Sequence, residues 1–120
     1  MSDKKYDLED RLVLFAANSA RFCNDVFGSP AGDYYAHQLL RSAGSSALNF
    51  GEAQGSSSIK DYCHKASISL KELKESRVNL KILFALSLGN HEKSAVLRNE
   101  CEQLIAIIST IIKNKSKSQN

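Results

Sequence analysis

The segment Gln38–Leu80 reads QLLRSAGSSALNFGEAQGSSSIKDYCHKASISLKELKESRVNL, and most of the architecture follows from it. Its first half is crowded with small residues, which let two helices approach closely. Charged groups spaced along a helix usually need partners. Polar residues recur at helical spacing in both halves: Arg41, Asn49, Glu52, Lys65, Glu72 and Glu75. We name these six residues the polar seam, and the segment predicts two packed helices that share it.

Upstream of this segment, apolar residues repeat at steps of four and three, as on one face of a helix. They are Leu8, Leu12, Phe15, Ser19, Phe22 and Val26, and they predict a helix at about 7–27. Gly28 then stops it, Ser29 caps a new helix, and Pro30 occupies its first position. A break near SAGSSA would split this second helix. Because its apolar face keeps one phase from Tyr35 to Ala53, we favour one helix over about 30–54.

Two further helices follow the GSSS turn at 55–58. Ser58 and Asp61 resemble a capping box at the start of the third helix, at about 58–88. The predicted core face of that helix comprises Ile59, Cys63, Ala66, Leu70, Leu73, Leu80, Phe84 and Leu88. Asn90 caps a fourth helix at about 91–113. Short loops favour an all-α, antiparallel up-down-up-down four-helix bundle over residues 1–112, with 113–120 as a flexible basic tail.

The third helix is apolar on two sides near its end. Val78, Ile82 and Leu86 point away from its core face. A small bundle cannot bury both sides of one helix by itself. Either the end of the fourth helix covers this side or another subunit does, and we favour self-association.

Basic residues concentrate on the third helix and after the last apolar residue, although the net charge is only +3. One stripe of the third helix contains four lysines and His64, and three more lysines follow the fourth helix. A stripe of this kind is either a solvated helix flank or a surface for phosphates. Aromatic residues are not interleaved with it, so single-strand readout is unsupported. The nucleic-acid-binding candidates are Lys60, Lys71, Lys74, Lys81, Lys113, Lys115 and Lys117.

Catalytic, metal and cofactor sites are not predicted. The Glu-x-x-His pairs of bundle di-iron sites are missing, and so are Gly-rich phosphate loops. Cys63 and His64 are adjacent and diverge by about 100° on a helix, so they cannot form a nucleophile–base pair. The cysteines show no C-x-x-C spacing and read as small buried hydrophobes. The N-terminus has no signal-peptide core and no apolar run reaches membrane-spanning length, so we expect a cytoplasmic protein.

The chain resembles a bacterial family of four-helix bundle proteins encoded by intervening sequences in large-subunit ribosomal RNA genes. The same family includes the accessory variability determinant of diversity-generating retroelements. The resemblance runs from YDLEDRLVLFA to Ile112, and its most specific pieces are QLLRSAGSSALNFGEA and DYCHKASISLKELKESR. The matched positions are Arg41, Ser42, Asn49, Glu52, Ala53, Lys65, Glu72 and Glu75. Where relatives often carry aromatic residues after Glu-Ser-Arg, this chain has Val78 and Asn79.

This resemblance implies a homo-oligomer, a ring-shaped pentamer without known enzymatic activity. It also implies that a basic surface contacts nucleic acid such as ribosomal RNA. We therefore expect a bundle that binds structured RNA or DNA through the seven lysines. The alternative is a protein-interaction scaffold that partners a neighbour-encoded protein such as a reverse transcriptase.

Overall fold

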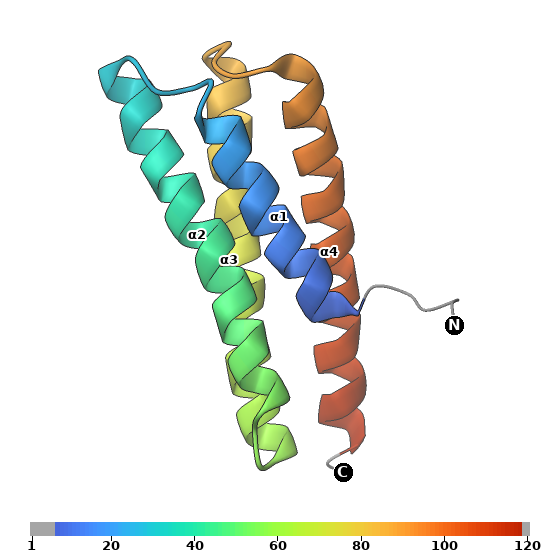
Figure 1. The fold of residues 1–120 in the computed structure, drawn as a ribbon. Helices are drawn as coiled ribbons and strands as arrows, with labels where there is room; N and C mark the ends of the chain where they lie inside the picture. Colours follow the sequence, from blue (N-terminus) through green and yellow to red (C-terminus); the bar gives the residue numbers. More distant parts are fainter. Residues whose placement is uncertain (1–6, 119–120) are drawn as a thin grey trace.

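The computed structural model describes residues 7–118, which form four helices and no strand. They are α1 (Leu8–Cys23), α2 (Pro30–Gln54), α3 (Ile59–Ala85) and α4 (His91–Ser118). The α1–α2 and α3–α4 connections lie at one end of the molecule and the α2–α3 connection lies at the other (Figure 1). The all-α, four-helix prediction is confirmed, and so is the favoured single helix over about 30–54, because α2 runs through SAGSSA without a break.

Each helix begins where a side chain accepts a hydrogen bond from an otherwise unpaired backbone N–H. The Asp10 N–H donates to the Asp7 carboxylate, and the Asp61 N–H donates to Ser58 Oγ. Ser29 caps α2 ahead of Pro30 in the same way, through the Gly32 N–H. Such caps contribute about 1 kcal/mol each. The capping residues predicted for the last three helices are confirmed.

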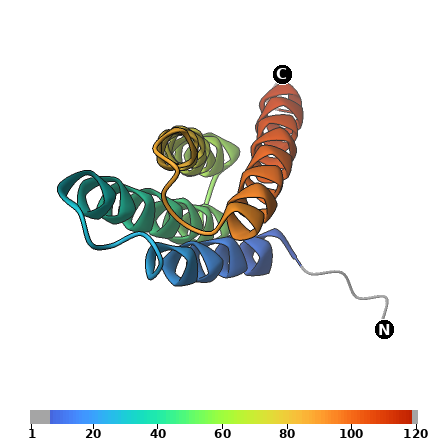
Figure 2. The same cartoon turned by 90° about the horizontal axis from the view of Figure 1, so that it is seen from above.

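The helices are arranged so that α1 and α3 lie on opposite sides of the bundle (Figure 2). Packing is most extensive between α2 and α3 and least extensive between α1 and α4. The described part of the chain is elongated, with principal extents of 49 × 32 × 19 Å. Because α1 is the shortest helix, the far ends of α2, α3 and α4 extend beyond it (Figure 1).

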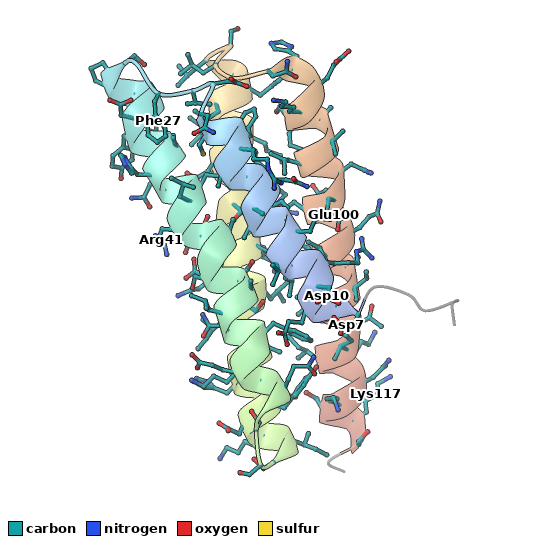
Figure 3. All side chains as sticks on the ribbon, in the orientation of Figure 1. Asp7, Asp10, Phe27, Arg41, Glu100 and Lys117 are labelled. Atoms are coloured by element: carbon teal, nitrogen blue, oxygen red, sulfur yellow. The ribbon has the colours of Figure 1, made fainter. Side chains whose placement is uncertain are left out.

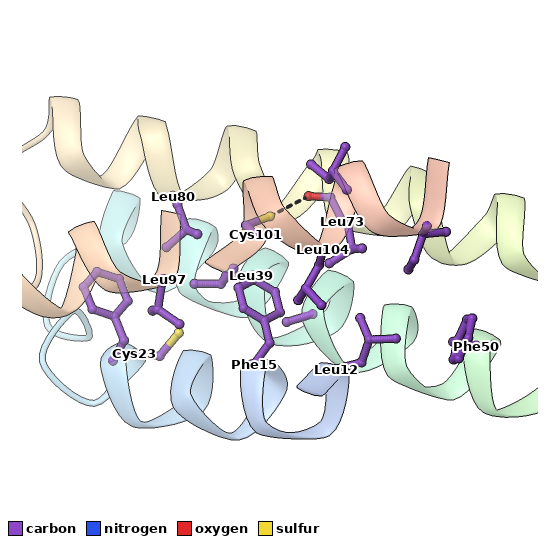
Figure 4. Close-up of a cluster of buried hydrophobic side chains, with 14 of the residues drawn as sticks. Leu12, Phe15, Cys23, Leu39, Phe50, Leu73, Leu80, Leu97, Cys101 and Leu104 are labelled. Atoms are coloured by element: carbon purple, nitrogen blue, oxygen red, sulfur yellow. Dashed lines mark hydrogen bonds between the residues drawn. The ribbon is translucent and has the colours of Figure 1, made fainter. Parts of the chain in front are cut away.

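All four helices contribute fully buried side chains to one core (Figure 4). Leu12 and Phe15 of α1 meet Leu39 of α2, Leu73 of α3 and Leu104 of α4 there. Burying a leucine or phenylalanine side chain contributes about 1.5–3 kcal/mol. The Sγ of buried Cys101 donates a hydrogen bond to the Leu73 carbonyl oxygen over 3.2 Å, which joins α4 to α3.

A close backbone approach fixes the α3–α4 connection. Gly89 has a φ of 87°, which favours glycine, and a Cβ added there would lie 2.4 Å from the Phe22 ring. Any other residue here would strain the backbone and force the Phe22 ring to move. The predicted stop at Gly89 therefore marks the connection, although α3 itself ends earlier, at Ala85.

Several predicted boundaries and core positions are wrong. The first helix ends at Cys23, well before residue 27, although Val26 still reaches the core from the following turn. The fourth helix continues to Ser118, so residues 113–118 of the predicted tail are helical. Phe84 is 41% exposed and Ile59 is 36% exposed, so neither is a core residue. Both lie near an end of α3, where fewer neighbouring helices cover it.

Candidate nucleic-acid interface

The seven candidate lysines lie on α3 and α4, and we name them the lysine surface. Lys60, Lys71, Lys74 and Lys81 are exposed along α3. The other three follow each other on the last two turns of α4: Lys113, Lys115 and Lys117. Within residues 7–118, none of the seven forms a salt bridge.

The two groups of lysines meet at one end of the bundle. The Lys115 Nζ lies 4.6 Å from the centre of the Tyr62 ring, and Cys63 Sγ lies 3.8 Å from Ser116 Oγ. The end of α4 therefore runs beside the start of α3, where Lys60 is located. Figure 3 labels Lys117 on the same lower part of α4.

Carboxylates are scarce around this end. After Glu102, α4 contains no acidic residue, and Asp61 is the one acidic residue between Ile59 and Lys71. Exposed lysines with few acidic neighbours create a local positive potential larger than the total charge of the chain suggests. An anionic partner would be attracted here.

The arginines are used differently, because every arginine of the chain has a partner within the fold. Arg11 bonds both carboxylate oxygens of Glu100, at 3.0 and 2.7 Å, and joins α1 to α4. Arg77 bonds Glu102 at 3.0 Å and joins α3 to α4. The planar guanidinium suits such forked contacts better than an ammonium does. These two ion pairs were not predicted from the sequence, because their residues lie on separate helices and far apart along the chain.

The polar seam joins α2 to α3. Arg41 bonds Glu72 at 3.1 Å and Glu75 at 2.5 Å, and these bonds raise the pKa of the Arg41 guanidinium, the bond to Glu75 most strongly. Lys65 bonds Glu52 at 2.7 Å, which raises the pKa of the Lys65 ammonium. Five of the six seam residues thus pair across the two helices: Arg41, Glu52, Lys65, Glu72 and Glu75.

Asn49, the sixth seam residue, bonds within α2 instead. Its side-chain amide donates to the Ser45 carbonyl oxygen at 2.9 Å and to Ser45 Oγ at 3.0 Å. The seam is therefore a mixture of interhelical ion pairs and one local contact. In the described chain, its charges are occupied by structural partners.

Buried serines lie directly behind the seam, where small residues were expected to let the helices approach closely, but their hydrogen bonds were not predicted. The hydroxyls of Ser42 and Ser76 are 2.7 Å apart, and Ser69 Oγ donates to the Ser46 carbonyl oxygen at 2.7 Å. All four side chains are fully buried. Serine scores as polar in a periodicity pattern, although its small size is what this close helix contact requires.

Burial was expected for all three cysteines, and two of them, Cys23 and Cys101, are buried. Burial raises the pKa of the Cys23 thiol to about 11, and burial raises that of Cys101 to about 12. Cys63 is only partly buried. Across residues 7–118, no three His, Cys, Asp or Glu side chains are grouped so that they could hold a metal ion.

An apolar groove lies between α1 and α4, where packing is thinnest. Its floor includes Leu14 and Val96, which are 46% and 66% exposed, beside buried Leu97. Polar side chains line its margins, among them Asn18 and Glu92. Because the groove exists only where α1 and α4 lie side by side, it could not be predicted from either helix alone.

The side of α3 that was predicted to need a cover remains exposed in the single chain. Val78 is 51% exposed and Leu86 is 46% exposed, while Ile82 is partly buried. The end of α4 cannot cover them, since it lies beside the opposite end of α3. The first of the two predicted covers, the end of the fourth helix, is therefore wrong.

The arrangement defines a four-helix bundle whose described residues present a lysine surface and paired arginines. A family model described as 23S rRNA-intervening sequence protein matches residues 15–110. The chain therefore belongs to the 23S rRNA-intervening sequence protein family, which confirms that part of the predicted resemblance.

A solved structure shares the fold. It is the crystal structure of a protein of unknown function from the S23 ribosomal protein family of Bacteroides thetaiotaomicron. The two are 23% identical with a TM-score of 0.79, over 89% of this chain and 99% of the other. No curated protein matches the chain. Within residues 7–118, no helix has the length and apolar character needed to cross a membrane.

Proposed function

We propose that this protein is a non-enzymatic, cytoplasmic bundle that binds nucleic acid through the lysine surface. The observation that supports it is the difference between the contacts of the arginines and those of the lysines. Arginines pair within the fold, whereas seven lysines on two adjacent helices have no carboxylate partner in the described chain. Phosphate groups would supply the missing anions. Ribosomal RNA is the first ligand to test, given the description of the family.

The test is the salt dependence of binding. If five of the lysines contact phosphates of a duplex, log K should fall with log salt with a slope of about −4.5. Affinity would then drop by about 500-fold between 50 and 200 mM salt. Fluorescence anisotropy with labelled RNA and DNA measures both quantities.

A pair of matched variants separates this surface from total charge. Lys71→Gln with Lys74→Gln should lower the salt slope by about 2, because two contacts are lost. The control is Arg21→Gln with Lys93→Gln, which removes the same charge near the α1–α4 groove. We expect the control to bind with nearly unchanged slope. Equal weakening by both variants, or binding without salt dependence, would contradict the proposal.

We further propose that the bundle is antiparallel, in up-down-up-down order, and assembles into a homo-oligomer, with a ring-shaped pentamer as the expected form. The positions of the three connections support the helix order (Figure 1). Exposed apolar residues on separate faces support assembly: Val78 on α3 and Leu48 on α2, which is 70% exposed. Light scattering coupled to chromatography measures the subunit number, and a monomer at micromolar concentration would overturn the assembly.

Two glycines of α2 allow a sharper test of assembly. Gly44 and Gly51 flank Leu48, and a Cβ added at either would meet nothing within 4 Å. Alanine at both positions should stabilise a single chain by about 1–2 kcal/mol, because glycine is a poor helix former. If another subunit packs closely on this face, the same variant should lower the subunit number. A variant that is more stable and still fully assembled would place the subunit contact elsewhere.

The second candidate function is a scaffold for a neighbour-encoded protein such as a reverse transcriptase. The apolar groove between α1 and α4 favours it, because exposed Leu14 and Val96 suit contact with another protein. Val96→Glu should abolish binding of such a partner while leaving RNA binding intact. Loss of RNA binding together with partner binding would argue against two separate surfaces.

A further inference from the structure

We propose that the lysine surface binds double-helical nucleic acid through its phosphates, and not single strands through their bases. This inference rests on the proposed function and names the class of ligand. Proteins that bind single strands combine positive charge with aromatic rings on which bases stack. Whether the aromatic rings near the lysine surface are free to stack on bases therefore distinguishes the two classes of ligand.

Phe84 is the exposed ring closest in sequence to Lys81, and its ring contacts an arginine and a histidine side chain. The guanidinium carbon of Arg98 lies 4.4 Å from the Phe84 ring centre. The His91 ring lies 5.1 Å away, centre to centre, tilted by 52°. A base that stacked on the Arg98 side of the Phe84 ring would have to displace this guanidinium.

Tyr62, at the other end of α3, is engaged in a similar way. The Lys115 ammonium sits 4.6 Å from the centre of the Tyr62 ring. The Phe50 ring meets it nearly edge-on, at 6.2 Å and 79°. Tyr62 is also partly buried. It therefore serves packing between helices and offers no free platform to a base.

Among residues 7–118, the most exposed tyrosine lies on a helix that carries none of the seven lysines. Tyr34 is 58% exposed and belongs to the first turns of α2. Those turns lie at the end of the molecule opposite the α2–α3 connection (Figure 1), and so away from Lys60 and from the lysines at the end of α4. The Tyr34 ring also meets the Tyr35 ring edge-on, at 5.0 Å and 89°.

The length of the lysine row fits a duplex. Lys60 and Lys81 lie 21 positions apart on one unbroken helix. At 1.5 Å per residue they are separated by about 31 Å, close to the roughly 34 Å of one duplex turn. A straight helix can place charges along such a rod without bending it.

Sequence-specific reading of bases is not supported on this face. Reading bases in a groove usually requires arginine, asparagine or glutamine side chains. The exposed positions of α3 from Lys60 to Lys81 contain none of these. Lysine contributes a point charge that recognises phosphate, whatever the base. The expected ligand is therefore a duplex of any sequence.

The experiment compares labelled 20-base-pair duplexes with their separated, unstructured strands, at one salt concentration. We expect the duplex to bind at least about tenfold more tightly, because its charge density is higher and no stacking favours the single strand. Two duplexes of unrelated sequence should differ by less than threefold. Duplexes of 6 base pairs should bind more weakly, since they are about 20 Å long and span only about two thirds of the lysine row.

The outcomes separate this inference from the proposed function. Equal or tighter binding of single strands would overturn the inference and leave nucleic-acid binding in place. Absence of binding to every probe would overturn both. A sequence preference above a hundredfold would also overturn the inference. RNA and DNA duplexes are tested in parallel, and a duplex of either kind that meets these criteria supports it.

Phe84→Leu provides an independent check on stacking. The ring is exposed at the end of α3, so its removal should leave duplex affinity within twofold. A tenfold loss of affinity for single strands, with duplex affinity unchanged, would show that a base displaces Arg98 and stacks there. That result would overturn the inference.

Discussion

Replacing Arg41 with alanine tests whether the polar seam stabilises the α2–α3 pair. Arg41 contacts two carboxylates in different surroundings: the side chain of Glu75 is 44% exposed, and that of Glu72 is 9% exposed. The exposed pair should contribute about 0.5 kcal/mol. Loss of the other partner leaves a nearly buried carboxylate uncompensated and should cost about 1–2 kcal/mol more. We therefore expect Arg41→Ala to lower the free energy of unfolding by about 2 kcal/mol.

Two double-mutant cycles measured by urea unfolding, one for Arg41 with Glu72 and one for Arg41 with Glu75, divide this loss of stability between the two contacts. The coupling of Arg41 with Glu72 should be about 1–2 kcal/mol, and that with Glu75 at most about 0.5 kcal/mol. In 1 M salt the coupling to Glu75 should disappear, because exposed charges are screened. The coupling to Glu72 should persist. All variants must be compared at one protein concentration, since assembly would add to the apparent stability.

Two results would refute the reasoning about the seam. One is an Arg41→Ala variant whose stability and subunit number both equal those of the parent protein. The other is a Glu75→Gln variant that costs as much as Arg41→Ala, because burial would then not govern the strength of these pairs. Glu75→Gln is therefore the matched control within the same cluster.

Other predictions concern the buried thiols and the serine contact. Thiol reagents should label Cys63 in the native protein and the two buried cysteines only after unfolding, as counted by mass spectrometry. Because the pKa of the Cys23 thiol is raised from 9.0 to about 11 and that of Cys101 to about 12, the folded state holds these protons more tightly. The stability that these two protonated thiols contribute should be complete below pH 9 and fall above it by about 1.4 kcal/mol per pH unit for each thiol. Urea unfolding of the parent protein and of the variant with Cys23→Ala and Cys101→Ala, as a function of pH, checks this. Ser69→Leu should overpack the α2–α3 contact and cost about 3 kcal/mol, against about 1 kcal/mol for Ser69→Ala, in the same assay.

The four helices were predictable because their core faces keep one period along the chain. Leu12, Phe15 and Phe22 fall on a stripe that is buried in the structure. Capping residues also carry local information, since a cap depends only on neighbours a few positions away. Predictions of this kind depend on interactions between residues close in sequence, so tertiary packing does not change them. The errors at the ends of helices arose where burial depends on a neighbouring helix, as at Phe84.

The partners within the polar seam were only partly predictable. A glutamate partner for Arg41 followed from helical spacing, but whether the pair lies within one chain did not. The structure brings Glu72 and Glu75 to Arg41 because Ser42 and Ser76 allow α2 and α3 to approach closely at that level. The burial of Glu72 could not be read from sequence, since it depends on this register. The groove between α1 and α4 was missed for the same reason.

The distribution of cations links the fold to the proposed function. Arginines of this chain bond carboxylates, as Arg11 and Arg77 do, an amide, as Arg21 does with Asn18, or an aromatic ring, as Arg98 does. Guanidinium groups lose little hydration in such contacts, so they suit positions within a fold. Lysines are strongly hydrated and flexible, and those on α3 and α4 are left without carboxylates in the described chain. A surface selected only for solubility would intersperse both signs of charge, as elsewhere on this bundle. Over about 31 Å of α3 the lysine surface departs from that pattern in one respect: Glu72 and Glu75 are paired with Arg41, and only Asp61 is left as an exposed carboxylate without a salt bridge. A long, regular polyanion is therefore the partner that this geometry favours.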